Sequence, residues 1–381
     1  MDQASTAPGS DNLPRLLTIL HREGARSRAQ LTADTGLNRS TIASLVASLT
    51  DSGLAVEHDP AQTRRVGRPS PVVSASPDVV AIAVNPEVDA VRLAAVGLDR
   101  AVRARAIVEL DAPPSPRQVA DVTAATIDAW RTGALSHARL AGIGLAVPGL
   151  VSGTALVANA PHLGWVGEPL AEIVAETTGL PARAGNDASL GALAEHRFGS
   201  GAGRDDVVYL NGGPSGIGGG IITGGRLLRG VSGFSGEFGH IVAPFTAPED
   251  RRTESGAFED ELRASDGGAV AQLRGAGEAG PPGAEDAADE RARRRRILAA
   301  TIATAVSILD TGAVVLGGTL APLLGEGKDA AELRDAIAAQ CIRPDDPDFA
   351  VLPAALADDR LFIGAAELAF ADLLADDALL A

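Results

Sequence analysis

The spacing of hydrophobic and polar residues predicts three short helices at the start of the chain. They are expected over residues 13–21, 28–35 and 38–52. Ser27 and Asn38 are suitable N-caps, because their side-chain oxygens can accept the free amide hydrogens of a first helical turn. The third helix carries apolar residues at the i, i+3, i+4, i+7 spacing of a helix that packs one face inward: Ile42, Leu45, Val46 and Leu49.

Two short segments with strand patterns, residues 54–57 and 66–73, follow the third helix. The turn Thr35-Gly36-Leu37 has the length that sets one helix across another. Three helices followed by a two-stranded wing predict a winged helix-turn-helix, which places its recognition helix in the major groove of DNA. From spacing alone, a small helical protein-interaction domain is the alternative.

Beyond residue 76, strand patterns alternate with helix patterns, which is typical of α/β architecture. Residues 1–10 are expected to form a disordered arm, and residues 265–292, rich in Gly, Ala, Pro and Glu, a mobile loop. The expected strands are 81–84, 91–98, 102–110, 143–147, 207–210 and 314–316, and the expected helices are 119–130, 170–178, 293–309 and the tail from 361.

The net charge of −16 by itself argues against a nucleic-acid-binding protein. Its distribution changes that conclusion, because residues 1–75 carry eight basic and seven acidic side chains. The acidity therefore belongs to the rest of the chain. We expect that acidic body to be repelled by DNA phosphates, which leaves only a local surface of the N-terminal module to bind DNA.

The composition indicates a cytoplasmic protein without a membrane segment. A single cysteine, Cys341, excludes an intrachain disulfide framework and any zinc site built on several cysteines. The first ten residues lack the basic-then-apolar pattern of a signal peptide. The most apolar stretch, residues 140–151, is broken by glycine and proline and is too short to span a bilayer.

The outward face of the third predicted helix carries side chains suited to DNA. Arg39 can reach guanine edges or phosphates, and the short donors Ser40, Thr41 and Ser44 follow it at the end that enters the groove. A second basic cluster, Arg64, Arg65 and Arg68, lies in the predicted wing. Its compact Gly67-Arg68-Pro69 turn could place an arginine in a narrow minor groove.

Several of these motifs together resemble the N-terminal domain of repressors of the ROK family (repressors, open reading frames, kinases). The resemblance implies DNA binding and adds Arg28, Gln30 and Asn38 to the predicted DNA contacts. It rests on four runs in the family's order, Ser27-Arg28-Ala29-Gln30-Leu31, Thr35-Gly36-Leu37-Asn38-Arg39-Ser40-Thr41, Gly53-Leu54 and Gly67-Arg68-Pro69.

The resemblance continues through the remainder of the chain and implies an actin-like, ribonuclease-H-type fold with a sugar held between two lobes. We expect a winged helix-turn-helix over residues 11–75 and a sugar-kinase-like domain over 76–381. Its first lobe would take residues 76–190 plus the C-terminal helix, and its second lobe residues 191–360. The motifs are Pro148-Gly149, His162-Leu163-Gly164-Trp165, Asn186-Asp187-Ala188-Ser189, Gly191-Ala192, the glycine-rich run 213–220, and Gly236-Glu237-Phe238-Gly239-His240.

The predicted sugar-binding residues are Asn186, Asp187, Glu237, His240 and Glu259. Carboxylates, an amide and an imidazole match the ring of hydroxyls on a sugar, because each hydroxyl both donates and accepts. In ROK kinases the residue that matches Asp187 is the base that deprotonates the sugar, and the one that matches Glu259 contacts it. Without the resemblance, the same residues are more simply explained as a helix cap and a surface pair.

Two features depart from ROK kinases. The glycine-rich turn that holds ATP phosphates is replaced by residues 85–89, where Glu87 and Asp89 would repel phosphate. The second glycine-rich run, 213–220, resembles a phosphate-binding turn, although close packing of a strand on a helix explains it better. The family's zinc-binding cysteines are replaced by Asp250, Arg252 and Ala257, so we expect neither ATP nor zinc.

The sequence therefore predicts a transcriptional regulator of carbohydrate genes, and a repressor in particular. It would bind a double-stranded operator as a homodimer or a dimer of dimers and respond to a sugar or sugar derivative. One alternative is an active sugar kinase with a DNA-binding arm. The other is a DNA-binding regulator whose sugar site has decayed and which another partner controls.

Overall fold

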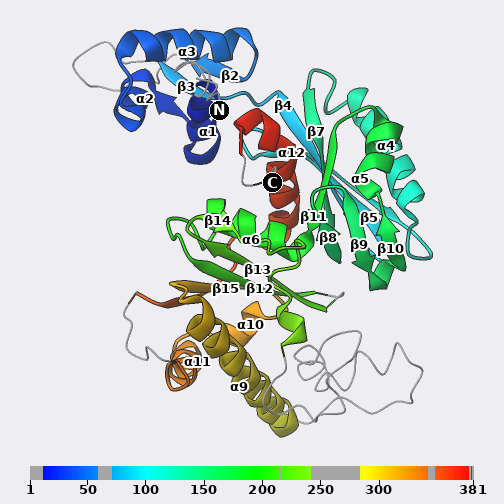
Figure 1. Cartoon of the computed structure of the whole chain (residues 1–381), viewed down its shortest axis with the longest axis vertical. Helices are drawn as coiled ribbons and strands as arrows, with labels where there is room; N and C mark the ends of the chain where they lie inside the picture. Colours follow the sequence, from blue (N-terminus) through cyan, green and yellow to red (C-terminus); the bar gives the residue numbers. More distant parts are fainter. Residues whose placement is uncertain are drawn as a thin grey trace, which may run out of the picture. The chain divides into compact units, whose positions relative to one another are not determined.

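The computed structural model describes residues 12–58, 71–213, 216–241, 284–341, 348–376 and 379. The chain divides into two compact units (Figure 1). The first unit comprises Met1–Gly185 and Leu361–Ala381, and the second comprises Asn186–Arg360. The expected N-terminal arm lies outside the described residues, as does most of the expected loop over 265–292. The last part of that expected loop is instead helical, because α9 begins at Ala284.

The first unit begins with three helices and a small antiparallel sheet of order β1-β3-β2. Ser27 and Gln30 form a reciprocal capping box at the start of the second helix, and Gly36 ends it with a φ of 72°. Asn38 caps the third helix through the amide of Thr41. The helix predictions are therefore confirmed: the elements are α1 (Asn12–Glu23), β1 (Arg26–Ser27), α2 (Arg28–Thr35), α3 (Arg39–Asp51), β2 (Ala55–His58) and β3 (Val72–Ala75).

A five-stranded sheet of order β11-β7-β4-β5-β6 forms the centre of the first unit. Its strands are β4 (Val79–Pro86), β5 (Ala90–Gly97), β6 (Val102–Glu109), β7 (Arg139–Val147) and β11 (Ala182–Asn186), with β4 and β7 parallel. The accompanying elements are α4 (Pro116–Arg131), α5 (Leu170–Thr178), α12 (Arg360–Leu374) and a second sheet of β8 (Leu150–Ser152), β9 (Leu156–Ala160) and β10 (Trp165–Glu168).

Strand β7 is covered on both faces. Ile143 and Leu145 belong to the apolar cluster that α4 and α5 complete. Gly144 lies between them and faces the opposite side, because neighbouring residues of a strand alternate. A Cβ at Gly144 would overlap the backbone carbonyl of Ala365 in α12. The backbone of α12 therefore rests directly on the strand, in contact that only glycine permits.

The second unit contains a five-stranded sheet of order β14-β13-β12-β15-β16, with β12, β15 and β16 parallel. Val208, Leu210 and Val314 pack with α9, whereas Tyr209 and Val315 pack with Ala192 of α6 on the other face. The elements are α6 (Asp187–Phe198), β12 (Val207–Gly213), β13 (Gly216–Thr223), β14 (Arg226–Leu227), α9 (Ala284–Leu309), β15 (Ala313–Gly318), α10 (Ala321–Leu324), α11 (Lys328–Ala338) and β16 (Ala350–Pro353).

The structure corrects the sequence-based boundaries at two places. The second strand of the wing begins at Val72 among the described residues, whereas residues 66–73 were expected. Other elements were not predicted, because they are brief, rich in glycine or lack a clear apolar period: the strands β1, β8 to β11, β13, β14 and β16 and the helices α6, α10 and α11. In the described part of the chain, no helix is both long and apolar enough to cross a membrane.

Replacing Gly144 by alanine is expected to destabilise the first unit by about 1–3 kcal/mol or more, since the added methyl group would meet backbone rather than a movable side chain. Chemical denaturation measures this change. Gly133→Ala is the matched control, because nothing lies within 4 Å of its added Cβ and its φ is not positive. Equal stability of the two variants would contradict the described packing of α12 on β7.

Candidate functional site

Helix α3 presents the side chains expected to contact DNA. Arg39, Ser40 and Ser44 are exposed, and Thr41 is half-buried. Within the described residues the Arg39 side chain has no ion pair or hydrogen bond, so its guanidinium is free to bind a base edge or a phosphate. Ser40 donates to the Asn38 side chain at 2.7 Å, so these two residues act together at the helix start.

The other predicted DNA contacts of the described helices already have partners. Arg28 forms a bidentate pair with Glu57 of β2, with both N–O distances at 2.7 Å. The Gln30 side chain accepts from the Ser27 amide at 2.8 Å in the capping box. Asn38 accepts from the Thr41 amide at 2.9 Å. These residues stabilise the module, and Arg28 would have to exchange Glu57 for phosphate in order to bind DNA.

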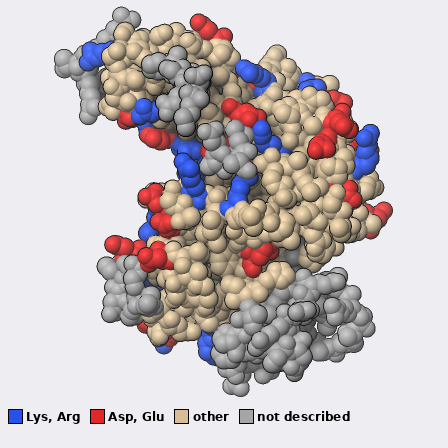
Figure 2. Space-filling view, viewed as in Figure 1, with Lys and Arg blue, Asp and Glu red and all other residues tan. Residues whose placement is uncertain are grey.

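The wing arginines Arg64, Arg65 and Arg68 lie outside the described residues, as does Glu259. Figure 2 shows acidic and basic side chains in small mixed groups on the face in view, without a broad field of one sign. An acidic chain with no extended basic surface in that view needs specific local contacts for DNA, which is the role predicted for Arg39.

The candidate sugar-binding residues of the second unit start at the N-terminus of α6. Asn186 is the N-cap, and its side chain accepts from the Ser189 amide at 2.9 Å. Asp187 is the first helical residue, and its carboxylate accepts from the Ala188 amide at 2.8 Å. Both side chains therefore bond amides at the start of α6, as expected if these residues form a helix cap. These hydrogen bonds also fix the two side chains in place at the start of α6.

The carboxyl group of Asp187 lies in an electrostatically unusual position. Burial raises its pKa from 3.8 to about 6. The Glu237 carboxylate adds to the rise, whereas the Ala188 amide and the Arg360 guanidinium oppose it. Asp187, Glu237 and Arg360 are therefore close enough to interact, and they form one cluster of two carboxylates and a cation.

Arg360 is a site residue that the sequence analysis missed. It begins α12, bonds the Tyr209 hydroxyl and acts on the charge of Asp187. It also donates to the Ala357 carbonyl of the turn before it. The only sequence signal is a lone arginine after Asp358 and Asp359, which by itself indicates a helix start. Its partners are distant in sequence, so spacing could not reveal the role.

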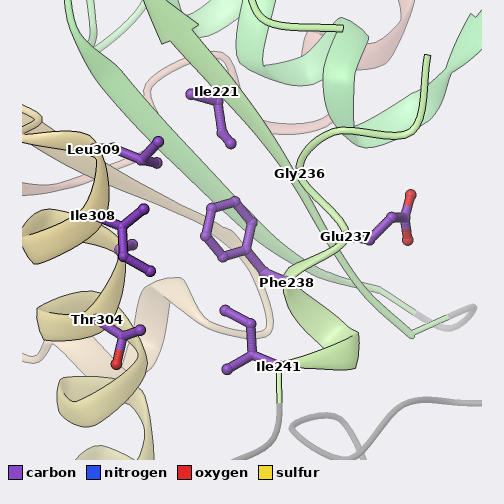
Figure 3. A pocket seen from close by; sticks show the side chains of 9 residues that line it. Ile221, Gly236, Glu237, Phe238, Ile241, Thr304, Ile308 and Leu309 are labelled. Atoms are coloured by element: carbon purple, nitrogen blue, oxygen red, sulfur yellow. The ribbon is translucent and has the colours of Figure 1, made fainter. Parts of the chain in front are cut away.

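Glu237 directly precedes a short 3₁₀ turn, Phe238–His240, and His240 is the last residue of that turn. Burial raises the pKa of Glu237, and the nearby His240 lowers it. Figure 3 shows Phe238 and Ile241 pointing toward α9, while the Glu237 carboxylate points the other way. The pocket between this turn and α9, about 210 Å³, has mainly apolar walls. It does not suit a sugar, and Glu237 faces the Asp187 cluster instead.

The glycine-rich run 213–220 is a β-hairpin, in which Gly213 pairs with Gly216. An added Cβ at Gly218 would lie 2.6 Å from the Cβ of Ala188, and one at Gly220 would lie 2.5 Å from that of Ala192. These glycines allow α6 to lie directly on β13 and so position Asp187. Close packing explains them, as the sequence analysis favoured, without a phosphate ligand.

The turn that would hold ATP phosphates in a kinase is occupied by this chain's own contacts. The Glu87 amide donates to the Ala90 carbonyl at 2.8 Å, and the Glu87 carboxylate pairs with Arg92 at 2.7 Å. Asn85 is buried and donates to the Ala146 carbonyl at 2.9 Å. The turn therefore presents carboxylates and few free amides, which does not fit a phosphate group.

The described residues contain no group of three or more His, Cys, Asp or Glu that could hold a metal ion. Asp250, Arg252 and Ala257, which replace the zinc-binding cysteines, lie outside those residues. Their chemistry does not fit zinc, because an arginine and an alanine supply no ligand.

The Asp187→Asn variant is expected to melt at a higher temperature than the wild type at pH 7.5. The folded state holds the Asp187 proton up to about pH 6, whereas the unfolded chain releases it near 3.8, so ionisation destabilises the native state as pH rises. The difference in melting temperature should grow between pH 4 and 6, stay constant above pH 6 and disappear below pH 4. Thermal scans at these pH values test it, and a pH-independent difference would contradict it.

Comparison with solved structures identifies the fold. The crystal structure of a ROK family transcriptional regulator, a homologue of the E. coli MLC protein, superposes with a TM-score of 0.75 at 22% identity and covers 98% of both chains. The Streptomyces griseus ROK glucokinase, solved with glucose and AMPPNP, gives a TM-score of 0.59 at 26% identity over 76% of this chain and 98% of its own. The expected winged helix-turn-helix followed by an actin-like domain is confirmed.

Sequence comparison identifies the family. The Bacillus subtilis xylose repressor is 30% identical over 249 residues, which are 65% of this chain and 64% of that repressor. The glucokinase of Streptomyces coelicolor is 32% identical over 161 residues, 42% of this chain and 49% of the enzyme. The chain thus matches less than two thirds of the length of either relative. The model of the ROK family matches residues 82–372, so the chain belongs to the ROK family.

Proposed function

We propose that this protein is a cytoplasmic transcriptional repressor that a sugar releases from its operator. The observation that carries the proposal is Arg39, which is exposed at the start of α3 and has no partner among the described residues, in a helix-turn-helix that precedes a ROK domain. The similarity to xylose repressors supports the same function. A two-fold symmetric homodimer would present two α3 helices to half-sites on one face of the duplex.

The proposed effector is a sugar or sugar derivative held by Asn186, Asp187, Glu237 and His240, with Glu259 as a further contact. Its hydroxyls would donate to the two carboxylates and accept from the imidazole and the amide. Arg360 would keep Asp187 partly ionised and able to accept. Binding would release DNA if the sugar prefers the state of the protein that fits the operator less well.

Catalysis of sugar phosphorylation is the second candidate function, because glucokinases are among the relatives and Asp187 stands where ROK kinases have their base. The turn at Glu87 weighs against it, since a nucleoside triphosphate would meet carboxylates there. We therefore propose that the chain has no kinase activity, uses no ATP and binds no zinc.

Substitution of Arg39 by alanine is expected to weaken operator binding by about 1–3 kcal/mol and to relax base preference. The reason is that Arg39 is a free cation at the groove-entering end of α3. Fluorescence anisotropy with a duplex selected by the wild type from random DNA measures the change at several salt concentrations. Arg117→Ala on α4 is the control and should bind normally. If Arg39→Ala also bound normally, α3 would not be the reading helix.

A panel of D-xylose, D-glucose, D-mannose and N-acetylmannosamine separates the repressor from the kinase. At least one sugar should raise the melting temperature, and Glu237→Ala should weaken its binding by about 10- to 100-fold, because a buried charge-assisted hydrogen bond contributes roughly 1.5–3 kcal/mol. ADP release with ATP present should stay at background. Turnover that Asp187→Ala abolishes would establish the kinase, and no shift with any sugar would indicate a decayed site.

A further inference from the structure

A buried, hydrogen-bonded histidine and glutamate join the DNA-binding module to the C-terminal helix. His21 of α1 and Glu367 of α12 are each 1% exposed, and the His21 Nε2 lies 2.6 Å from the Glu367 carboxylate. The other ring nitrogen, Nδ1, lies 2.6 Å from the Leu98 carbonyl. Both ring nitrogens of His21 therefore have a partner, one a carboxylate and the other a backbone carbonyl.

Other contacts of α1 with α12 and with the residue Asp376 beyond it surround this pair. Thr18 donates to the Leu374 carbonyl at 3.3 Å, and Arg22 pairs with Asp376 at 2.7 Å. The edge of the His21 ring meets Phe370, with ring centroids 5.8 Å apart. The C-terminal half of α1 is therefore held by α12 and the residues that follow it. A buried polar group that loses its hydrogen-bond partner is destabilising, so the contact is sensitive to small displacements.

The same helix starts within the candidate sugar site. Arg360, its first residue, belongs to the second unit and interacts with Asp187 and Tyr209. From Leu361 onward α12 belongs to the first unit. Arg360 and Glu367 are seven residues apart, so they lie on the same side of the helix about 10 Å along its axis. One continuous helix thus links the site cluster to the contact with α1.

We infer that α12 carries the regulatory signal from the sugar site to the DNA-binding module, with His21 and Glu367 as the positioning residues that transmit it. The inference rests on the proposed function and adds the path by which the sugar site would act on the DNA-binding module. A ligand that hydrogen-bonds to Asp187 would weaken the interaction between Asp187 and Arg360, the first residue of α12. A resulting shift of α12 would change the contact between Glu367 and His21 of α1. By linkage, bound DNA must change the affinity for the sugar by the same factor as the sugar changes the affinity for DNA, and on this route the change passes through α12.

Hydrogen–deuterium exchange on the full-length chain tests this route with DNA as the only ligand. In the wild type, a selected duplex is expected to protect α3 directly and to change exchange in α12 by about tenfold, the size of a typical coupling between sites. Glu367→Gln should abolish the change in α12 while α3 remains protected. Thr18→Val, which removes only one peripheral hydrogen bond, should reduce the change in α12. This milder variant keeps the test valid if Glu367→Gln fails to fold.

Asp372→Asn is the matched control. Asp372 lies on the same helix but pairs with Arg183 of β11 at 2.9 Å, within the first lobe. In the Asp372→Asn variant, DNA should change hydrogen exchange in α12 as it does in the wild type. A response of α12 that survives in Glu367→Gln and Thr18→Val, or a wild type in which DNA protects α3 and leaves α12 unchanged, would overturn the route while keeping DNA binding. If no duplex protects α3 in the wild type, the proposed function itself fails and the route falls with it.

Discussion

Direct contact between helix and strand backbones is the constraint on which the described architecture depends. Helix α12 rests on Gly144 of β7, and α6 rests on Gly218 and Gly220 of β13. A side chain at any of these positions would push the helix outward by more than the tolerance of a packed core. The site residues Asp187 and Arg360 stand at the first turns of these two helices, so the glycines determine where the charges lie.

The cluster around Asp187 has properties that would serve either catalysis or the recognition we propose. A carboxyl group with a pKa near 6 is poised to exchange a proton close to neutrality, as a general base requires. The same property suits a hydroxyl acceptor whose charge Arg360 supports. In the proposed function the two roles differ at the phosphate turn, where the Glu87 carboxylate pairs with Arg92. The feature that would separate a regulator from a kinase therefore lies outside the proposed sugar site.

Local features were predictable from the sequence, because capping and periodicity depend on neighbouring residues. Ser27, Gly36 and Asn38 marked helix ends that the structure confirms, and the buried strands β4, β7 and β12 followed from their apolar runs. The pairs of Arg28 with Glu57 and His21 with Glu367 were not predictable, since their partners are 29 and 346 residues apart. Arg360 was missed for the same reason. The candidate sugar residues came from family resemblance, and only the structure places Asp187 and Glu237 together.

The anchoring of α1 by α12 also has a consequence for synthesis on the ribosome. The partners of His21, Thr18 and Arg22 in α12 and beyond it are synthesised 346 to 356 residues after α1 itself. The helix-turn-helix can fold early around its own apolar core, but His21 has no partner carboxylate until Glu367 has been made. A nascent chain would therefore carry a formed helix-turn-helix before α12 could hold it, and the docking of α1 on α12 would follow the folding of the module.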